Sequence, residues 1–391
     1  MVLVQNKDAC CGCRVCEKVC PKNAITMVAD ECGFLYPQID EAKCIDCGLC
    51  VKKCAFQSGY KTRKEFEPSL GFGARHKKET GYMNSRSGGA FVALSNYVLA
   101  QGGSVYGAGY DEEEGFYKVV HKAATDKKSR NELRGSKYVQ SDLKNTFPEI
   151  KEKLEKGEYV LFSGTGCQVG ALYAYLPKEY DTLFSVDILC HGVPSPLLWK
   201  EFLLMREKEF HGKVEAVQFR NKKKYGWAAH KETIRINGKN HNSRIFAKIF
   251  HGEFSRPSCY KCVYTNQNRV GDITIADFWG YEKAIPGMWD DDKGVSLVLI
   301  NTEQGKKIWD LSNHELDTIE CTGYKYRHGV LRKPSTKASN YDEFWMDYQK
   351  HGFKYIIEKY ANYTPENYWI QNTQEEIKNI VKKCLKVLKL R

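Results

Sequence analysis

Cysteine is the residue type through which this sequence can do chemistry. The chain of 391 residues contains 16 cysteines, and ten of them precede residue 55. Cytoplasmic proteins keep so many thiols for metal or redox chemistry, whereas disulfide frameworks belong to secreted proteins. The amino terminus lacks the basic-then-apolar pattern of a secretory signal. We therefore expect a cytoplasmic protein whose cysteines bind metal.

The amino-terminal cysteines fall into two runs of four with the same spacing. The first run, followed by Pro21, consists of Cys10, Cys13, Cys16 and Cys20. The second run consists of Cys44, Cys47, Cys50 and Cys54. This is the spacing of bacterial ferredoxins, in which the fourth cysteine of each run ligates the cluster of the other run. The sequence therefore predicts two [4Fe–4S] clusters, one on Cys10, Cys13, Cys16 and Cys54 and the other on Cys44, Cys47, Cys50 and Cys20.

Zinc is the alternative metal for four thiolates. Zinc knuckles and ribbons use paired cysteines and do not repeat a run of four twice, so the spacing favours iron–sulfur clusters. Two details depart from the ferredoxin pattern. Ala55 stands where the second run would carry proline, and Cys11 lies beside Cys10 as a competing ligand.

Four cysteines in the rest of the chain could form a third metal site. Two segments with strand character lead into sharp turns at Cys167 and Cys190, each followed by a helical pattern. Ligands gather at the carboxyl edge of an open α/β sheet, so these two thiols could face one site. Cys259 and Cys262 lack a second close pair downstream. We expect the four thiols to hold a third [4Fe–4S] cluster; zinc, inert thiols and a cysteine nucleophile are the alternatives.

A glycine-containing turn precedes a helix that we expect at residues 90–101. The apolar residues of this helix repeat with helical spacing, which makes Ser87 the predicted N-cap, followed by Gly88 and Gly89. Free N–H groups at a helix start can bind an anion, so the turn could hold a cofactor phosphate or could simply cap the helix. Glycines at residues 164–170 miss the dinucleotide fingerprint by one residue, so we predict no Rossmann NAD site.

Several of these segments resemble the family of the beta subunit of coenzyme F420-reducing hydrogenase and dehydrogenase, with an amino-terminal ferredoxin module attached. The stretches that carry the resemblance are Ser85-Arg86-Ser87-Gly88-Gly89, Gly135-Ser136-Lys137-Tyr138-Val139, residues 162–168, residues 187–192 and residues 259–280. Members of this family are iron–sulfur flavoproteins that hold FAD beside a cluster in the large domain. The resemblance therefore implies FAD and strengthens the expectation of a third cluster.

Three turns are the candidates for binding this flavin, because they offer N–H donors or a cation without bulky side chains. They are Ser87, Gly88 and Gly89; Gly135, Ser136 and Lys137; and Gly164, Thr165 and Gly166. His191, which follows a proposed cluster ligand, is the candidate catalytic residue. It could donate a proton to a substrate or hydrogen-bond a cluster sulfur, and we favour the hydrogen bond.

The motifs divide the chain into four parts. We predict a ferredoxin-type domain over residues 1–60, a linker over 61–75, a domain for FAD and the third cluster over 76–325, and a helical extension over 326–391. The expected fold class combines α+β and α/β. A bacterial-type ferredoxin-like domain precedes a mixed-sheet α/β flavin-binding domain, and a helical carboxyl-terminal region follows.

Charge and apolar patterns bear on binding partners. The net charge of +12 would suit nucleic acid, anionic lipid or an acidic ferredoxin, but the basic runs carry no nucleic-acid motif, so we expect no nucleic-acid binding. We expect the basic run at residues 220–224 to be a solvated hairpin end, with docking of an acidic carrier as the alternative. An apolar helix face over residues 377–388 could lie on a membrane, but we expect it to pack on its own domain.

These inferences converge on an iron–sulfur flavoprotein oxidoreductase. We predict that it passes electrons from a ferredoxin-like donor protein, or from a deazaflavin, through the clusters and FAD to a two-electron small-molecule substrate. Some members of the family that it resembles serve surface-polysaccharide pathways. The alternative is a relay subunit without its own substrate pocket, which feeds a partner redox subunit.

Overall fold

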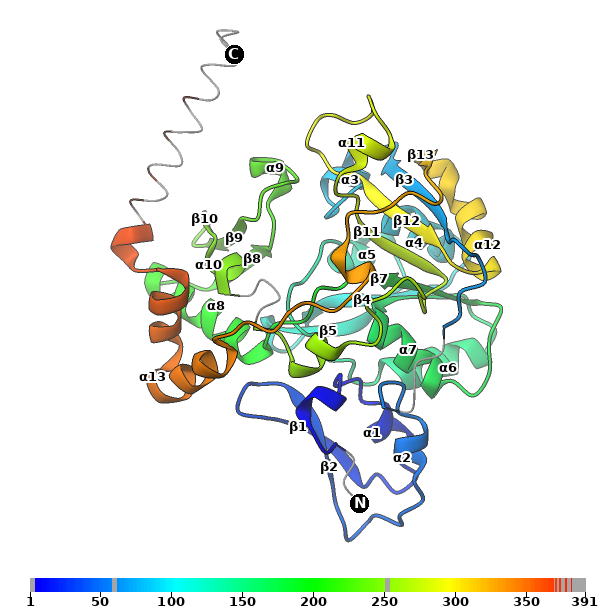
Figure 1. The fold of residues 1–391 in the computed structure, drawn as a ribbon, viewed down its shortest axis with the longest axis horizontal. Helices are drawn as coiled ribbons and strands as arrows, with labels where there is room; N and C mark the ends of the chain where they lie inside the picture. Colours follow the sequence, from blue (N-terminus) through cyan, green and yellow to red (C-terminus); the bar gives the residue numbers. More distant parts are fainter. Residues whose placement is uncertain are drawn as a thin grey trace.

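The computed structural model describes residues 4–57, 62–249 and 254–368, together with positions 370, 373, 377 and 381. Figure 1 shows the amino-terminal module, in dark blue, against one side of a large sheet domain, with a smaller lobe of green and orange elements beside it. The predicted fold class is confirmed, because a ferredoxin-like module precedes a mixed-sheet α/β domain and a helical carboxyl-terminal region.

The amino-terminal module repeats one small motif. Its elements are η1 (Lys7–Ala9), α1 (Val15–Val19), β1 (Ile25–Ala29), β2 (Leu35–Ile39) and α2 (Leu49–Lys52), with β1 and β2 paired as an antiparallel hairpin. Each helix follows a left-handed residue that stands between the second and third cysteines of its run, Arg14 (φ 64°) and Gly48 (φ 69°). Because the same backbone turn recurs at equivalent positions, both cysteine runs fold alike.

The large domain is built on an eight-stranded mixed sheet. Its strands, in spatial order, are β13 (Leu316–Glu320), β3 (Leu70–His76), β12 (Ser296–Ile300), β11 (Ile273–Asp277), β7 (Leu183–Ile188), β6 (Val160–Thr165), β4 (Ser104–Asp111) and β5 (Gly115–Ala124). The central strands β11, β7, β6 and β4 are parallel, and the outer pairings are antiparallel. Parallel strands bring their carboxyl ends to one edge, where the turns after β6 and β7 lie side by side.

Helices cover both faces of this sheet. The first face packs against α4 (Ala90–Ala100), α5 (Lys127–Leu133) and α12 (Glu303–Ser312), and the second against α6 (Thr146–Glu155) and α7 (Gly166–Tyr175). Within β6, Leu161 faces the first core whereas Val160 and Phe162 face the second, as the two-residue period of a strand requires. Shorter elements at the margins are α3 (Glu79–Met83), α11 (Tyr281–Ala284), η3 (Asn313–Glu315) and η4 (Gly329–Leu331).

A smaller lobe is inserted between β7 and β11. It contains α8 (Pro196–Phe210), β8 (Val214–Gln218), α9 (Lys222–Tyr225), β9 (Glu232–Ile236), β10 (Lys239–Ser243), α10 (Ile245–Ile249) and η2 (Pro257–Lys261). The carboxyl-terminal helix α13 (Tyr341–Ala361) completes the lobe. Trp199 of α8, Phe246 of α10 and Phe344 of α13 are buried in one aromatic core, so the helical carboxyl-terminal region is joined to this insertion.

The predicted linker over residues 61–75 is partly wrong, because β3 begins at Leu70 and pairs with β12 and β13. The sequence did not predict β3 as a strand because it contains glycine at positions 71 and 73, and glycine is depleted in strands. Gly71 is required by packing, since a side chain there would come within 1.9 Å of the Tyr326 hydroxyl. The sheet domain therefore begins within the segment that we had assigned to the connection.

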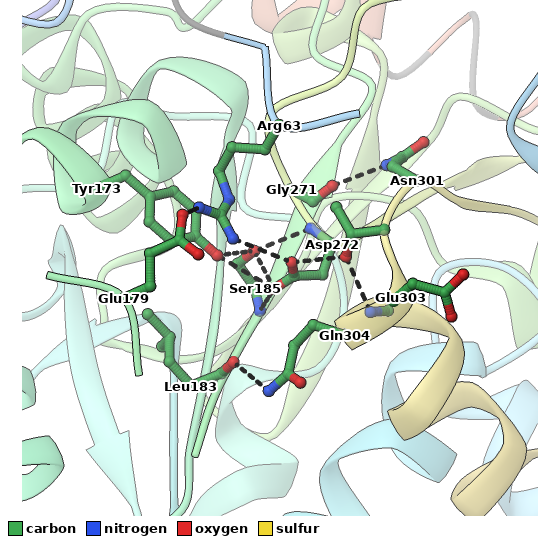
Figure 2. A network of polar contacts seen from close by, with 12 residues as sticks. Arg63, Tyr173, Glu179, Leu183, Ser185, Gly271, Asp272, Asn301, Glu303 and Gln304 are labelled. Carbon is green, nitrogen blue, oxygen red and sulfur yellow. Dashed lines mark hydrogen bonds and ion pairs between the residues drawn. The ribbon is translucent and has the colours of Figure 1, made fainter. Parts of the chain in front are cut away.

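The chain upstream of β3 is anchored to the sheet by a buried polar network (Figure 2). The Arg63 guanidinium stacks on the ring of Tyr173 at 3.9 Å, pairs with Glu179 and lies 3.8 Å from Asp272. The carboxylate of Asp272 is fully buried and accepts hydrogen bonds from the Ser185 backbone (2.8 Å) and hydroxyl (2.7 Å). Burial raises the pKa of Asp272, while Ser185 and Arg63 oppose the rise. This network ties residue 63 to β7 and to the start of β11.

None of the helices in the described part of the chain has the length and apolar character that a membrane crossing needs. The apolar helix face predicted over residues 377–388 lies almost wholly outside the described residues. Of that face, Ile377 and Val381 are described, and both are exposed.

Candidate functional site

The structure brings together the four cysteines that we assigned to the second predicted cluster. This second thiol set, Cys20, Cys44, Cys47 and Cys50, lines one pocket of the amino-terminal module. Cys20 comes from the first run and the other three cysteines from the second. The fourth cysteine of the first run therefore joins the second set, as predicted. Cys47 is exposed to solvent, whereas Cys50 is buried. The second thiol set therefore lies at the surface of the module.

The first thiol set, Cys10, Cys13, Cys16 and Cys54, is likewise assembled. Cys16 lies close enough to the other three sulfurs for each of them to oppose its ionisation. Burial raises the pKa of Cys10, Cys16 and Cys54. Grouped buried thiols of this kind release their protons when a metal binds. All eight amino-terminal cysteines are therefore arranged in the two sets that their spacing predicts.

The third thiol set, Cys167, Cys190, Cys259 and Cys262, lines one pocket that we call the thiol pocket. Thr165 at the end of β6 pairs with Ile188 at the end of β7, which places the turns bearing Cys167 and Cys190 next to each other. The segment of η2 supplies the other two thiols. Burial raises the pKa of Cys190 and of Cys262 to about 12. Strand topology thus unites cysteines that are up to 95 positions apart in the sequence.

Cys167 is held by a chain of hydrogen bonds that begins in its own turn. The Thr165 hydroxyl lies 3.1 Å from the Cys167 sulfur, and the Thr165 N–H donates to the Gln168 side chain at 3.0 Å. Gln168 in turn donates to the Ser141 hydroxyl at 2.9 Å. Gly166 packs tightly here, since a side chain would come within 3.0 Å of Tyr264. The Gly164–Gly166 turn, which we had considered for the flavin, therefore serves the thiol pocket.

Cys11 lies between the first and third thiol sets. Its thiol lines the thiol pocket and interacts electrostatically with the thiols of both Cys13 and Cys167. These contacts lower the pKa of Cys167 to about 7. Sequence reasoning identified Cys11 only as a competing ligand, because the contact depends on how the module docks. The two sets therefore adjoin across the interface between the amino-terminal module and the large domain.

The module is docked through polar contacts that surround Cys11. Gln140 donates to the Cys11 carbonyl at 2.9 Å, and the Tyr264 hydroxyl donates to the Ala55 carbonyl at 2.9 Å. Arg14 donates to Asp142 at 3.0 Å, and α1 packs on α7. The first thiol set is thereby fixed against the large domain, whereas the pocket of the second set is lined by residues of the amino-terminal module.

His191 stands at the rim of the thiol pocket, with its backbone carbonyl accepting a hydrogen bond from Ser335 at 2.6 Å. The residue is exposed. Its position permits either predicted role, proton donation to a substrate or a hydrogen bond to a cluster sulfur, and the two remain predictions.

The turn at Ser87, Gly88 and Gly89 is buried, and Ser87 is not the helix cap that we predicted. Gly89, with φ 93°, is the N-cap of α4, and the Ser87 hydroxyl donates to the Val295 carbonyl instead of capping the helix. A side chain at Gly88 would come within 2.1 Å of the Ala74 carbonyl oxygen. The glycines therefore allow this turn to pack directly on β3 and β12, and its role in binding a phosphate remains a prediction.

Four cations gather beside this turn, and we call them the basic cluster: Arg86, Arg134, Arg220 and Lys222. Lys222 is 5% exposed and donates to the carbonyls of Tyr82 (2.6 Å) and Ser87 (2.8 Å). Burial and the nearby Arg86 lower the pKa of Lys222 to about 7. Our expectation that the basic run is solvated is therefore wrong for Lys222, because carbonyl groups draw it inward, while Lys223 and Lys224 are exposed as expected.

The basic cluster carries more positive charge than the carboxylate beside it can offset. Asp277 pairs with Arg86 at 3.0 Å and with Arg220 at 3.5 Å. The Nε atoms of Arg86 and Arg134 and the Nη1 of Arg220 have no hydrogen-bond partner among the described residues. Buried N–H groups without partners and an excess of positive charge are costly, so this cluster has the character of a binding site for an anion.

The Gly135–Lys137 turn adjoins the basic cluster through Tyr138, whose ring lies 5.5 Å from the Arg220 guanidinium. Gly135 and Ser136 are exposed. The Lys137 ammonium donates to the carbonyls of Glu132 (2.7 Å) and Arg134 (3.0 Å), and burial lowers its pKa to about 7. Of the three candidate flavin turns, this is the one whose surroundings suit an anionic ligand.

A stacked pair of indole rings also contacts Asp277, the carboxylate that pairs with the basic cluster. Trp227 and Trp279 stack with ring centroids 4.3 Å apart, and the Trp227 N–H donates to Asp277 at 3.1 Å. The Trp227 carbonyl accepts from Arg86 at 3.2 Å. Asp277 ends β11, which pairs with β7 in the parallel part of the sheet. The basic cluster and the thiol pocket therefore flank neighbouring strands.

Comparison with known proteins agrees with this arrangement. Residues 157–322 match the family described as the C terminus of the coenzyme F420 hydrogenase/dehydrogenase beta subunit, and residues 9–58 match the 4Fe-4S dicluster domain. Residues 157–322 are a domain of this F420 hydrogenase/dehydrogenase family. The resemblance inferred from the sequence is thereby confirmed.

Among similar proteins is the F subunit of the F(420)H(2) dehydrogenase of Methanosarcina mazei, which is 23% identical over 331 residues, covering 80% of this chain and 85% of that protein. A chain in a solved structure of the F420-reducing [NiFe] hydrogenase complex from Methanosarcina barkeri is 18% identical, over 75% of this chain and 89% of that chain, with a TM-score of 0.44.

The F420 hydrogenase/dehydrogenase domain contains the whole third thiol set, and the dicluster domain contains the first and second sets. All three sets fit iron–sulfur clusters by their chemistry. Each offers four thiols, and backbone N–H groups point at one sulfur in each. Gly12 donates to Cys10 at 3.4 Å, Ala24 to Cys20 at 3.3 Å, and Gly192 to Cys190 at 3.4 Å. Hydrogen bonds to ligand sulfurs tune iron–sulfur potentials.

FAD also fits the residues that are present in and around this domain. A diphosphate suits buried guanidinium groups with unpartnered N–H atoms, which the basic cluster supplies. Sequence reasoning quoted Arg86 only as part of a family stretch and took Arg220 and Lys222 to be solvated. Arg134 gave no sequence signal, because its role depends on the turn that brings its side chain to Gly81 and Ser85.

Proposed function

We propose that this chain is an iron–sulfur flavin-dependent oxidoreductase that passes electrons between a one-electron carrier protein and a two-electron small-molecule substrate. Three [4Fe–4S] clusters on the three thiol sets and one FAD at the basic cluster would serve this function. The family match and the dicluster match support iron–sulfur electron transfer. The proposal adds the cysteine ligands of each cluster and FAD as the flavin cofactor.

The observation that carries the proposal is the succession of the thiol sets. The second set opens to the surface at Cys47, the first set lies at the domain interface, and the Cys11 thiol lies between the first set and the third. A path for single electrons therefore leads from the surface of the module into the large domain. An electron-transfer protein needs such closely spaced centres, whereas separate structural metal sites do not.

The side chains of this chain have distinct tasks in the proposed reaction. Arg86, Arg134 and Arg220 would bind the FAD diphosphate, and the Trp227–Trp279 pair would limit water on the side of Asp277. When bound, FAD supplies the exchange between one-electron and two-electron chemistry. His191, at the rim of the thiol pocket, would hold a proton near the substrate or donate a hydrogen bond to a cluster sulfur.

A relay subunit within a larger redox complex is the second candidate function. It is favoured by the Methanosarcina mazei relative, whose name describes it as a subunit of a dehydrogenase. In that case the exposed second thiol set would face a partner redox subunit, and no small-molecule substrate would bind. A deazaflavin electron donor is compatible with either candidate.

One experiment separates the two functions. The full chain is purified without oxygen, its retained flavin is measured, and its reduction of an added two-electron acceptor is followed with reduced ferredoxin as donor. Retained FAD, with acceptor reduction that needs no protein besides this chain and the ferredoxin donor, supports the enzyme. Clusters without flavin, and no acceptor reduction, support the relay and contradict the enzyme.

A further inference from the structure

A buried arginine joins the first thiol set to the third. Arg256, just before η2, is 0% exposed and lines the thiol pocket. Its Nε donates to the Cys10 carbonyl at 2.7 Å, and its Nη2 lies 3.6 Å from the Cys10 sulfur. One guanidinium therefore touches a ligand of the first set and borders the pocket of the third.

The remaining contacts of Arg256 are neutral. Nη1 donates to the Gln140 side chain at 3.1 Å and Nη2 to the Leu35 carbonyl at 2.8 Å. The guanidinium also lies over the Tyr36 ring at 4.2 Å from the centroid. No carboxylate among the described residues pairs with it. Its charge is thus fully buried without a counter-ion from any of these side chains.

Two other arginines at the same interface show that this is unusual here. Arg14 is bound by Asp142, and Arg269, which also lines the thiol pocket, lies 3.1 Å from Asp187. Arginine stays protonated when it is buried, and an unpaired buried charge is costly, so a negative group is expected to offset it. For Arg256 the negative groups within reach are cysteine sulfurs, since its charge acts on Cys10, Cys13 and Cys167.

We propose that Arg256 is the counter-ion shared by the first and third clusters and that it raises the reduction potential of both. This inference rests on the proposed iron–sulfur function. Each reduction adds one electron to a thiolate-ligated cluster, and burial disfavours the added negative charge. A fixed cation and its N–H···S contact stabilise the reduced form, which offsets the effect of burial. Arg256 is therefore a positioning and tuning residue for electron transfer across the domain interface.

The test is a potentiometric titration of the anaerobically purified full chain, followed by EPR, for Arg256→Met and Arg256→Lys. Arg256→Met should lower the potentials of the first and third clusters and leave that of the second cluster unchanged. The expected shift is at least tenfold in the ratio of reduced to oxidised cluster at fixed potential, or about 59 mV for one electron. Arg256→Lys keeps the charge but loses the fork of donors, so its shift should be smaller.

The matched control is Lys261→Met, which removes a charge between Cys259 and Cys262 in the sequence. Lys261 is 73% exposed and pairs with Asp8, so water screens it and its removal should leave every potential unchanged. Cys10→Ser identifies the signal of the first cluster, because a changed ligand alters its EPR spectrum. If Arg256→Met does not retain iron, Arg256→Gln is the uncharged variant for the same titration.

Two results would overturn the inference: potentials that stay unchanged in an iron-replete uncharged variant, or a shift confined to one cluster. A wild-type chain that binds no iron would instead contradict the proposed function. Iron content, measured before each titration, distinguishes these failures.

Discussion

The affinity for FAD should fall as pH rises above neutrality, and Lys222 should account for much of this dependence. Lys222 is buried within the basic cluster, and burial together with Arg86 lowers its pKa to about 7. Below that pH the side chain is charged and attracts the diphosphate. Above it the free protein holds a neutral lysine, which has to take up a proton when the anion binds.

The size of the effect follows from this pKa. Each pH unit above about 7 costs about 1.36 kcal/mol for the proton that is taken up, which is a tenfold loss of affinity per lysine. At about pH 9 the loss through Lys222 approaches 100-fold. Lys137, whose pKa burial also lowers to about 7, adds a second contribution of the same sign if its turn contacts FAD. Lys222→Met should therefore flatten the dependence by up to one power of ten per pH unit.

The assay is a fluorescence titration of FAD into the flavin-free protein at fixed ionic strength, between about pH 6 and about pH 9. Lys223→Met is the control, since Lys223 belongs to the same basic run but is exposed. It should leave the slope unchanged. An affinity that is constant over this range, or a Lys222→Met slope equal to that of the wild type, would refute the placement of the diphosphate at the basic cluster.

Three further predictions test other parts of the structure. Cys54→Ser and Cys20→Ser should each lower the iron content by about four atoms per chain, but Cys54→Ser should remove the EPR signal of the first cluster and Cys20→Ser that of the second; loss of the opposite signals would disprove the crossed sets. Asp272→Asn should lower the free energy of unfolding, measured in urea, by about 3–5 kcal/mol, because a buried carboxylate with several donors loses its charge. Glu179→Gln, at the exposed end of the same network, should lower it by less than about 1 kcal/mol. Equal losses in the two variants would contradict the buried network. Arg86→Met should weaken FAD binding by about 10- to 100-fold, the value of one charge-assisted hydrogen bond, and calorimetry that finds unchanged affinity would contradict its role.

Short-range cysteine spacing was sufficient to predict the two amino-terminal thiol sets. The left-handed turns at Arg14 and Gly48 are local, so the residues between the cysteines determine the loops that bring the sulfurs together. The third set was predictable for a different reason. Cys167 and Cys190 each follow a strand, and parallel neighbours place their carboxyl ends at one edge.

The basic cluster and the domain interface could not be predicted in the same way. Lys222 lies in a charged run that resembles a solvated turn, and only the approach of the Tyr82 and Ser87 carbonyls buries it. The contact between Cys11 and Cys167 joins residues 156 positions apart, and it depends on the docking of the whole module. At Gly88 the sequence pattern is the same for an anion-binding turn and for a turn that packs on a strand, and only the structure reveals the close approach of Ala74.

The most direct test of the central claim is the iron count of the oxygen-free wild-type protein beside that of Cys167→Ser. Three cubanes require about twelve irons per chain, and Cys167→Ser should retain about eight because it disrupts the third set alone. A wild-type protein with about eight irons and an unchanged count in Cys167→Ser would contradict a cluster in the thiol pocket, and zinc in place of iron would contradict the electron path as a whole.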